Sequence, residues 1–308
     1  MLHSVLSYFA VALLWAASSA LMGGCAGRGV PEIPIIDPSG GTAQSALETA
    51  SRLEALLPAD VLMLGEQHDA VEHQQIAQQV VAHLAARGSL AALAIEMADA
   101  GASTSALKPS SSEEQVRSAL KWDNKGWPWA AYGPVLMTAV RAGVPVIGAN
   151  MPRSEMKTAM GDDMLDRLLP GPALKAHQQL VRLGHCNLLP ESQINPMARI
   201  QIARDMNMAQ TVRQAALPGK VLVLLTGSRH ADRTLGVPQH LPASLKIKSI
   251  LLRAGGPGDH ATGTGAKSEK DSAYDGIWTT RALPETDYCA GLRKQFPPQR
   301  AADSKNKT

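Results

Sequence analysis

The stretch DVLMLGEQHDAVEHQQIAQQVV, residues 60–81, decides the fold. Its apolar run ends at Gly65, the letters EQHD follow, and a helical pattern begins directly after them. A short, continuous apolar run bounded by turn residues is typical of a strand buried on both faces of a parallel sheet. Glu66 and His68 are two residues apart, so they project to the same side if the chain is still extended there. Asp69 is placed to cap the helix that follows.

Four further apolar runs of this kind follow, with helical patterns between them. The five runs cover residues 61–65, 90–97, 144–150, 220–227 and 247–253, and the main helical patterns cover about 72–86, the residues after 132, and about 195–216. Strand and helix in alternation imply right-handed crossovers between parallel strands. We therefore predict an α/β fold, a three-layer domain with a mostly parallel central sheet flanked by helices, over residues 46–254.

Ionisable side chains stand at the ends of four of these runs. In parallel α/β sheets, ligands bind outside the carboxyl ends of the strands. Carboxylate, imidazole and guanidinium groups would therefore gather at one edge of the sheet, which we call the rim. Such a concentration of ionisable side chains favours a ligand site over ordinary turns. In chain order the residues are Glu66, His68, Glu96, Arg153, Arg229 and His230.

Local motifs do not identify the chemistry of this rim. The sequence has no G-x-S-x-G elbow, no phosphate-binding loop and no G-x-G-x-x-G after a strand. The letters HDAVEH, residues 68–73, do not match the spacing of a zinc-binding helix. A metal site would combine strand ends, with Glu66, His68 and His230 as ligands and one open position. A hydrolase, metal-dependent or using a general base, would draw on these three residues and Glu96.

The first 24 residues differ in composition from the rest of the chain. Residues 5–25, VLSYFAVALLWAASSALMGGC, form an apolar, alanine-rich run that ends in small residues before Cys25. This pattern predicts a signal peptide over residues 1–24 and a lipoprotein cleavage site, with the lipid on Cys25. An uncleaved anchor of roughly 18 residues is the alternative. Both imply export to a bacterial cell envelope, and Ala26 after the cysteine favours the outer membrane.

Composition also marks the segments outside the core. Residues 25–45 are rich in Gly, Pro and Ser and are expected to form a flexible tether. Residues 255–273 form a Gly-rich linker or loop, residues 274–296 a C-terminal extension, and residues 297–308 a charged, disordered tail. The formal net charge of +3 is small, and no basic patch with interleaved aromatics occurs, which argues against a nucleic-acid partner.

Two cysteines remain once Cys25 is set aside. In an oxidising compartment Cys186 and Cys289 can form one disulfide, or they can remain as two free thiols. Their sequence separation does not distinguish these alternatives.

Five motifs occur in a set order across residues 60–253. They are LGEQHD, AIEM, GWPWAAYGPVLMTAVRAGVPVIGANMPR, HCNLLPE followed by RIQIARDMNMAQTV, and VLLTGSRHADRTLGVPQHLP. With the leader, they resemble the ChaN family of haem-binding lipoproteins, in the haem-uptake and Tiki-like superfamily. The resemblance implies an α/β domain that binds haem, dimers that enclose two haems, and a role in iron acquisition beside an outer-membrane haem receptor. Distant branches of the superfamily are hydrolases, including metal-dependent proteases.

The resemblance also implies candidates for haem binding. Iron ligation in the family is attributed to a tyrosine supported by histidine, and Tyr132 in WPWAAYGP is the tyrosine inside a family-like motif. A phenolate suits ferric haem, although Tyr132 could equally pack at a helix start. His185 in LGHCNLLPE is the alternative iron ligand or a partner of a propionate. Arg153 and Arg229 are candidate propionate partners, because a guanidinium forks onto a carboxylate.

Further residues complete this set. Glu66, His68 and His230 are expected to contribute to the haem site from the rim. Three tryptophans offer flat apolar surface for a porphyrin, or else core packing: Trp122, Trp127 and Trp129. Four histidines fall on helix or linker stretches that we expect to be exposed, and they are assigned no role: His73, His83, His177 and His260.

Taken together, the sequence predicts a haem-binding envelope lipoprotein that acts in haem and iron uptake, holds haem at the rim of the sheet and forms a homodimer. The alternative is a hydrolase that uses the same rim, with a divalent metal ion as cofactor in its metal-dependent form.

Overall fold

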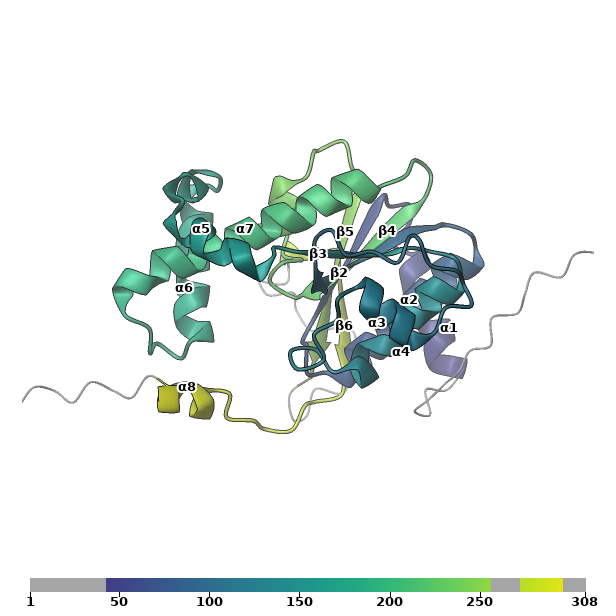
Figure 1. Cartoon of the computed structure of the whole chain (residues 1–308), viewed down its shortest axis with the longest axis horizontal. Helices are drawn as coiled ribbons and strands as arrows, with labels where there is room; N and C mark the ends of the chain where they lie inside the picture. Colours follow the sequence, from purple (N-terminus) through teal and green to yellow (C-terminus); the bar gives the residue numbers. More distant parts are fainter. Residues whose placement is uncertain (1–42, 256–271, 296–308) are drawn as a thin grey trace, which may run out of the picture. The chain divides into compact units, whose positions relative to one another are not determined.

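A six-stranded, all-parallel sheet forms the centre of the computed structural model, which describes residues 43–255 and 272–295 (Figure 1). The strand order is β3-β2-β4-β1-β5-β6. The predicted fold class is confirmed, and all five predicted strands are present. The strands are β1 Val61–Glu66, β2 Leu90–Asp99, β3 Val146–Asn150, β4 Val221–Gly227, β5 Ile247–Ala254 and β6 Gly276–Thr280.

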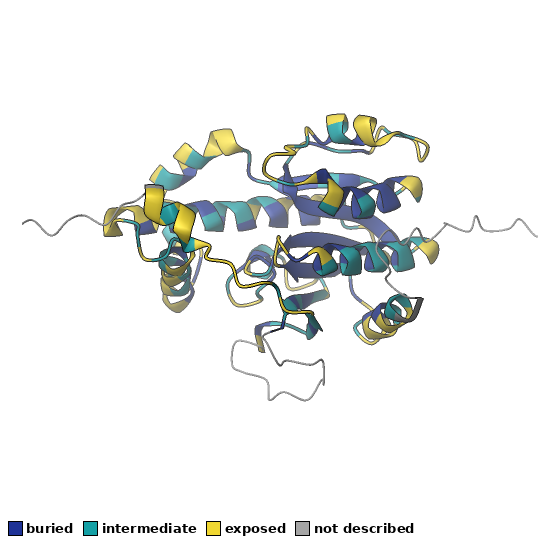
Figure 2. Ribbon diagram, turned by 90° about the horizontal axis from the view of Figure 1, so that it is seen from below, coloured by how far each residue is buried: buried dark blue, intermediate teal, exposed yellow. Residues whose placement is uncertain are grey.

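Helices cover both faces of the sheet, as the continuous apolar strands require (Figure 2). Leu62 and Leu64 of β1 join a core with the helices of one face, which are α1 Ala43–Glu54, α2 Val71–Ala86, α3 Glu113–Ala119 and α4 Trp129–Arg141. Val61 and Met63, which alternate with them, pack on the other face against α7, Glu191–Ala215, and the short η3, Val237–His240. Each fully buried aliphatic side chain contributes about 1.5–3 kcal/mol, so β1 is fixed from both sides.

A helical group follows β3 and packs on the first half of α7. It consists of η1 Arg153–Glu155, α5 Met156–Gly161, η2 Asp163–Arg167 and α6 Gly171–Gly184. Its apolar contacts centre on Leu165, Ile200 and Ile202. Arg199 of α7 binds both carboxylate oxygens of Asp166, at 3.0 and 2.7 Å, which fixes η2 on the helix.

The segment after β5 contributes more to the fold than its composition indicates. Residues 276–280, inside the expected C-terminal extension, form β6, which pairs in parallel with β5. Trp278 is buried at this edge of the sheet beneath the guanidinium of Arg52. Cys289 begins α8, Cys289–Gln295, and is disulfide-bonded to Cys186, with 5.9 Å between their Cα atoms. Of the two alternatives for these cysteines, the structure therefore contains the pair.

Several expectations fall outside the described residues: the leader, the lipidation site at Cys25, nearly all of the tether, most of the 255–273 linker and the 297–308 tail. Within residues 43–255 and 272–295, none of the helices has the length and apolar composition needed to cross a bilayer.

Candidate functional site

The register of the strands aligns the rim residues along one edge of the sheet. β1 pairs with β4 so that Glu66 lies opposite Gly227, and β4 pairs on its other side with β2. Oε2 of Glu96 accepts hydrogen bonds from the backbone amide of Gly227 and from the hydroxyl of Thr226, each at 2.7 Å. Parallel strands thus deliver two carboxylates, one from β1 and one from β2, to the same edge of the sheet.

Glu66 is the centre of a buried hydrogen-bond network. Its side chain is inaccessible to solvent, and its Oε1 accepts from Nδ1 of His68 at 2.8 Å and from the hydroxyl of Tyr132 at 2.6 Å. Its Oε2 accepts from Nε2 of Gln74 at 2.7 Å. A buried carboxylate without such donors would cost several kcal/mol. The network therefore fastens the start of α2 and the start of α4 to the end of β1.

His68 is the member of this network that faces solvent, with 37 % of its side chain exposed. Its Nε2 lies 4.0 Å from Glu96, and its ring meets Trp127 edge to face at 4.8 Å. Burial lowers the pKa of His68, but the hydrogen bond to Glu66 and the charge of Glu96 outweigh it and raise the pKa. A Cβ on Gly227 would lie 3.0 Å from Nε2, so the absent side chain at that position makes room for the imidazole.

A second buried group of charged side chains, His230 and Asp205, lies next to Glu96. Nδ1 of His230 contacts Oδ1 of Asp205 at 2.6 Å, and its Nε2 lies 3.6 Å from Oε1 of Glu96. Burial lowers the pKa of His230, but the charges of Asp205 and Glu96 outweigh burial and raise it to about 9. Burial likewise raises the pKa of Glu96, but His230 and His68 lower it to about 2. At neutral pH a cationic imidazole is thus held between two anions.

Asp205 was not singled out from the sequence, although a signal was present. It shares a face of α7 with Met208, Ala209 and Val212, which lie three, four and seven residues further on and are buried against the sheet. An acid on the apolar face of a long helix requires a buried partner. From that requirement His230 could have been predicted as the buried partner of Asp205.

The network does not have the arrangement of a metal site. Within the described ranges, no group of three or more His, Cys, Asp or Glu side chains is placed to hold a metal ion. The oxygens of Glu66 and Oε2 of Glu96 are already occupied by protein donors. The divalent-metal alternative predicted for Glu66, His68 and His230 is therefore unsupported.

Tyr132 lies inside the core. Only 1 % of the residue is exposed, and its ring lies 5.9 Å from the rings of both Trp122 and Trp127. Trp129 is also buried and meets Trp122 edge to face at 5.5 Å. Burial and the negative charge of Glu66 raise the pKa of Tyr132, so its phenol remains protonated. Trp122 and Trp127 pack against this tyrosine, Trp129 packs against Trp122, and of the three Trp127 also contacts the partly exposed ring of His68.

His185 and Arg229 form a separate group at the end of α6. Nδ1 of His185 donates to the carbonyl of Val181 at 2.8 Å, which leaves the lone pair of Nε2 as the ring's ligand atom. The exposed guanidinium of Arg229, just after β4, donates to the carbonyl of Leu180 at 3.3 Å and lies 3.4 Å from where a Cβ on Gly184 would stand. Arg153, by contrast, is exposed on η1, and the described contacts bring it into neither group.

Two histidines that we expected on exposed helix faces are buried. His73 is fully buried: its Nδ1 accepts from the amide of Gln67 at 3.0 Å and its Nε2 contacts Thr280 of β6 at 3.0 Å. Burial lowers its pKa to about 4. His177 is buried against the carbonyl of Leu235. Each is covered by a distant segment that helical periodicity cannot detect. His83 remains partly exposed beside Glu54, and His260 lies outside the described residues.

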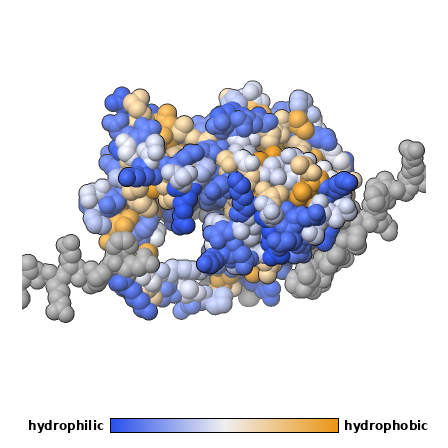
Figure 3. All heavy atoms as spheres, viewed as in Figure 1, coloured by the Kyte–Doolittle hydropathy of each residue, from blue (hydrophilic) through white to orange (hydrophobic). Residues whose placement is uncertain are grey.

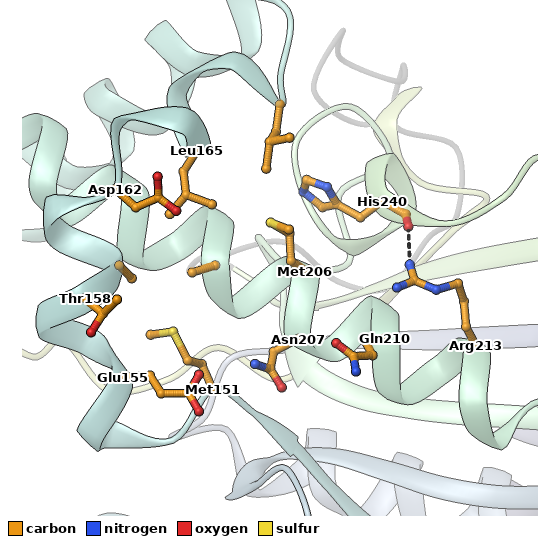
Figure 4. A pocket seen from close by; sticks show the side chains of 13 residues that line it. Met151, Glu155, Thr158, Asp162, Leu165, Met206, Asn207, Gln210, Arg213 and His240 are labelled. Carbon is orange, nitrogen blue, oxygen red and sulfur yellow. Dashed lines mark hydrogen bonds between the residues drawn. The ribbon is translucent and has the colours of Figure 1, made fainter.

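A separate cavity of about 530 Å³ lies between α7 and the helical group after β3 (Figure 4). Met151, Asp162, Met206 and His240 are among its lining side chains, and the carbonyl of His240 accepts from Arg213 at 2.8 Å. It contains neither the Glu66 network nor His185, so it is not the predicted rim site.

An all-parallel sheet with ionisable groups gathered at the carboxyl ends of its strands defines a ligand-binding α/β domain. Residues 52–241 match the family described as haem-binding uptake, Tiki superfamily, ChaN, and the chain belongs to that family, as the motifs predicted.

Two solved structures are similar to this chain. One, described as cofacial heme binding to ChaN of Campylobacter jejuni, is 26 % identical with a TM-score of 0.55, over 67 % of this chain and 85 % of that one. The other, the type III effector HopBA1, is 13 % identical with a TM-score of 0.40, over 73 % and 88 %, which is too distant to carry an argument. No curated protein matches the chain.

Proposed function

We propose that this protein binds haem at the carboxyl-terminal rim of its sheet and acts in haem and iron uptake. The observation that carries the proposal is its membership of the ChaN family, together with the similarity to Campylobacter jejuni ChaN, whose structure is described by its cofacial haem binding. That similarity covers 85 % of the Campylobacter chain, so it concerns nearly the whole of that structure.

The residues at the end of α6 suit haem chemically. Haem offers an iron that takes a nitrogen or oxygen ligand and two propionates that take cationic donors. The Nδ1–H of His185 donates to a backbone carbonyl, which fixes the ring and leaves Nε2 as the ligand atom. The Arg229 guanidinium next to Gly184 is exposed and available to a propionate.

We therefore assign iron ligation to His185 in preference to Tyr132. A ligand from Tyr132 would require loss of the phenol proton at a buried site beside the Glu66 carboxylate, and the same two factors raise its pKa. It would also require the ring to leave the tryptophans around it. In this proposal Glu66, His68 and His230 support the rim and do not bind the iron.

Assembly and location are part of the same proposal. Cofacial haems require two haem-bearing faces to meet, so we infer a homodimer from the relative's description. The N-terminal pattern supports a lipid anchor on Cys25 in the outer membrane of a cell envelope. A haem receptor of that membrane is then the expected donor or acceptor of haem.

The test is a titration of haemin into the purified full-length chain in detergent, followed in the Soret region. We expect saturable binding and a ferric histidine spectrum. His185→Ala should change that spectrum and weaken binding by at least about tenfold, the equivalent of about 1.4 kcal/mol. Absence of saturable binding by the unmodified chain would overturn the proposal.

Matched variants separate ligation from folding. His83→Ala removes another partly exposed, hydrogen-bonded histidine, on α2, and should leave the titration unchanged. Tyr132→Phe should lower the stability of the fold but leave the haem spectrum unchanged. Loss of the spectrum in this variant would show that Tyr132, and not His185, is the iron ligand.

Hydrolysis by general base catalysis is the second candidate function. One observation favours it: the partly exposed side chain of His68 donates from Nδ1 to Glu66, which leaves Nε2, 4.0 Å from Glu96, as an oriented base. Cleavage of a panel of nitrophenyl esters should then disappear in His68→Asn while haem binding persists. Rates no higher than buffer with the unmodified chain would remove this candidate.

A further inference from the structure

The cavity between α7 and the helical group after β3 is an elongated groove, which we call the α5–α7 groove. Its α7 wall follows the spacing i, i+3, i+4, i+7 and i+10, which is one face of a helix: Ala203, Met206, Asn207, Gln210 and Arg213. At about 1.5 Å of rise per residue, this wall is about 15 Å long. The other wall repeats the spacing along α5 and its two ends, with Glu155, Thr158, Ala159 and Asp162. The volume of about 530 Å³ is in the range of about 300–1,000 Å³ typical of small-molecule sites.

The two ends of the α5–α7 groove carry opposite charges. Glu155 and Asp162 lie on the side of the cavity opposite Arg213 and His240 (Figure 4). Among the described residues Glu155 has no ion-pair partner, and Asp162 uses Oδ1 to accept from the amide of Met164. Arg213 is exposed and donates from one guanidinium nitrogen to the carbonyl of His240, which leaves its other N–H groups for a ligand. A ligand that fills the groove therefore meets carboxylates at one end and a guanidinium at the other.

His240 adds a polar group at the guanidinium end. Its imidazole is directed toward the cavity beside Met206 (Figure 4). The Nε2 atom of this ring is buried and has no hydrogen-bond partner within the described ranges. Buried polar atoms in folded proteins are nearly always paired, so an unpaired nitrogen in a cavity wall points to a ligand that pairs with it. With a small turn of the ring, an Nε2–H would donate to a carboxylate held by Arg213.

The middle of the groove is apolar, with two carboxamides on one side. Leu168 and Met206 line it and are 47 % and 37 % exposed, and the space-filling view shows apolar patches among hydrophilic side chains on this helical group (Figure 3). Methionine adapts to ligands of varied shape. Asn207 and Gln210 have no side-chain hydrogen bond to any described residue. Each carboxamide offers a donor and an acceptor, the pair that a peptide backbone also offers.

We propose that the α5–α7 groove binds a short, apolar peptide in extended form. Its amino terminus lies toward Glu155 and Asp162, its backbone pairs with the two carboxamides, and its carboxylate is bound by Arg213 and His240. An extended chain rises about 3.3 Å per residue, so a wall of about 15 Å accommodates about four residues. A fatty acid would satisfy the guanidinium but leave the acidic end without a cation. The inference goes beyond haem binding, because the groove contains none of the rim residues and does not include His185.

The experiment is calorimetric titration of the full-length chain in detergent with the tetrapeptide Ala-Leu-Leu-Ala. We expect saturable binding of the form with free termini, weakened at least about tenfold by N-acetylation and by C-amidation. Arg213→Gln should weaken the free peptide by the same factor and should bind the free and the amidated peptide equally. Glu155→Gln should do so for the acetylated form. Arg153→Gln, which removes an exposed arginine of η1 outside the groove, should match the unmodified chain.

Several results would overturn the inference. They are no binding of the free peptide, equal binding of its free and blocked forms, or saturable binding of laurate without binding of the peptide. Haemin titration of Arg213→Gln should match the unmodified chain, so a failure of this inference is distinct from a failure of the proposed function.

A second pair of variants places the peptide in the groove. Met206→Glu introduces a carboxylate into the apolar wall and should abolish peptide binding, with folding checked by the Tm. Met164→Glu alters another exposed methionine, on η2, that does not line the groove, and should leave the affinity unchanged. Equal peptide affinity in the two variants would show that the peptide binds elsewhere and would overturn the assignment.

Discussion

The buried contact between His230 and Asp205 makes the stability of the fold depend on pH. The folded state keeps the proton of His230 up to about pH 9, because Asp205 and Glu96 outweigh the effect of burial, whereas the ordinary pKa of histidine is 6.5. The stabilisation is therefore complete below pH 6.5 and is lost as pH rises to about 9. At about 1.4 kcal/mol per pH unit, the free energy of unfolding should fall by about 3 kcal/mol over that range.

The perturbation is Asp205→Asn, which keeps an oxygen acceptor for Nδ1 but removes the negative charge. Urea unfolding followed by tryptophan fluorescence at several pH values gives the free energy of unfolding. We expect Asp205→Asn to be destabilised at pH 6 and to lose most of the slope between pH 6.5 and 9.

The control is Asp166→Asn, which breaks an ion pair between η2 and α7 whose arginine does not titrate in this range. Asp166→Asn should lower the free energy of unfolding by the same amount at pH 6.5 and at pH 9. A flat wild-type curve, or an Asp205→Asn curve parallel to the wild type, would refute the assignment of a buried imidazolium to His230.

Three further predictions concern neighbouring residues. His73 stays neutral in the fold because burial lowers its pKa to about 4, so stability should decrease as pH falls from 6.5 to 4, and His73→Gln should flatten that part of the curve. Gly227→Ala places a Cβ 3.0 Å from the Nε2 atom of His68 and should cost about 1–3 kcal/mol, whereas Gly161→Ala, with nothing within 4 Å, should not lower the Tm. Tyr132→Phe removes a buried hydrogen bond to a carboxylate and should cost about 1–3 kcal/mol in the same assay; an unchanged midpoint would contradict the network.

The sequence by itself determined the fold class, the family and the edge of the sheet at which the rim residues gather. Continuous apolar runs such as residues 61–65 can be read locally, because a strand buried on both faces has no polar alternation. The carboxyl ends of parallel strands share one edge, so Glu66, Glu96 and His230 could be placed together without knowledge of the register.

The tertiary structure decided which of these groups contact one another and which side chains are buried. Glu96 meets Thr226 across 130 residues of sequence. His73 is covered by Thr280, 207 residues away in β6, a strand of only five residues, GIWTT, that lies beyond the Gly-rich linker and was not predicted. The tertiary structure also placed Tyr132 in the core, and it showed that Asp69 does not cap α2, because the N-cap is Ala70 and no side chain caps it. Burial and hydrogen bonding set the charge state of an ionisable side chain, and both depend on segments brought together only by folding.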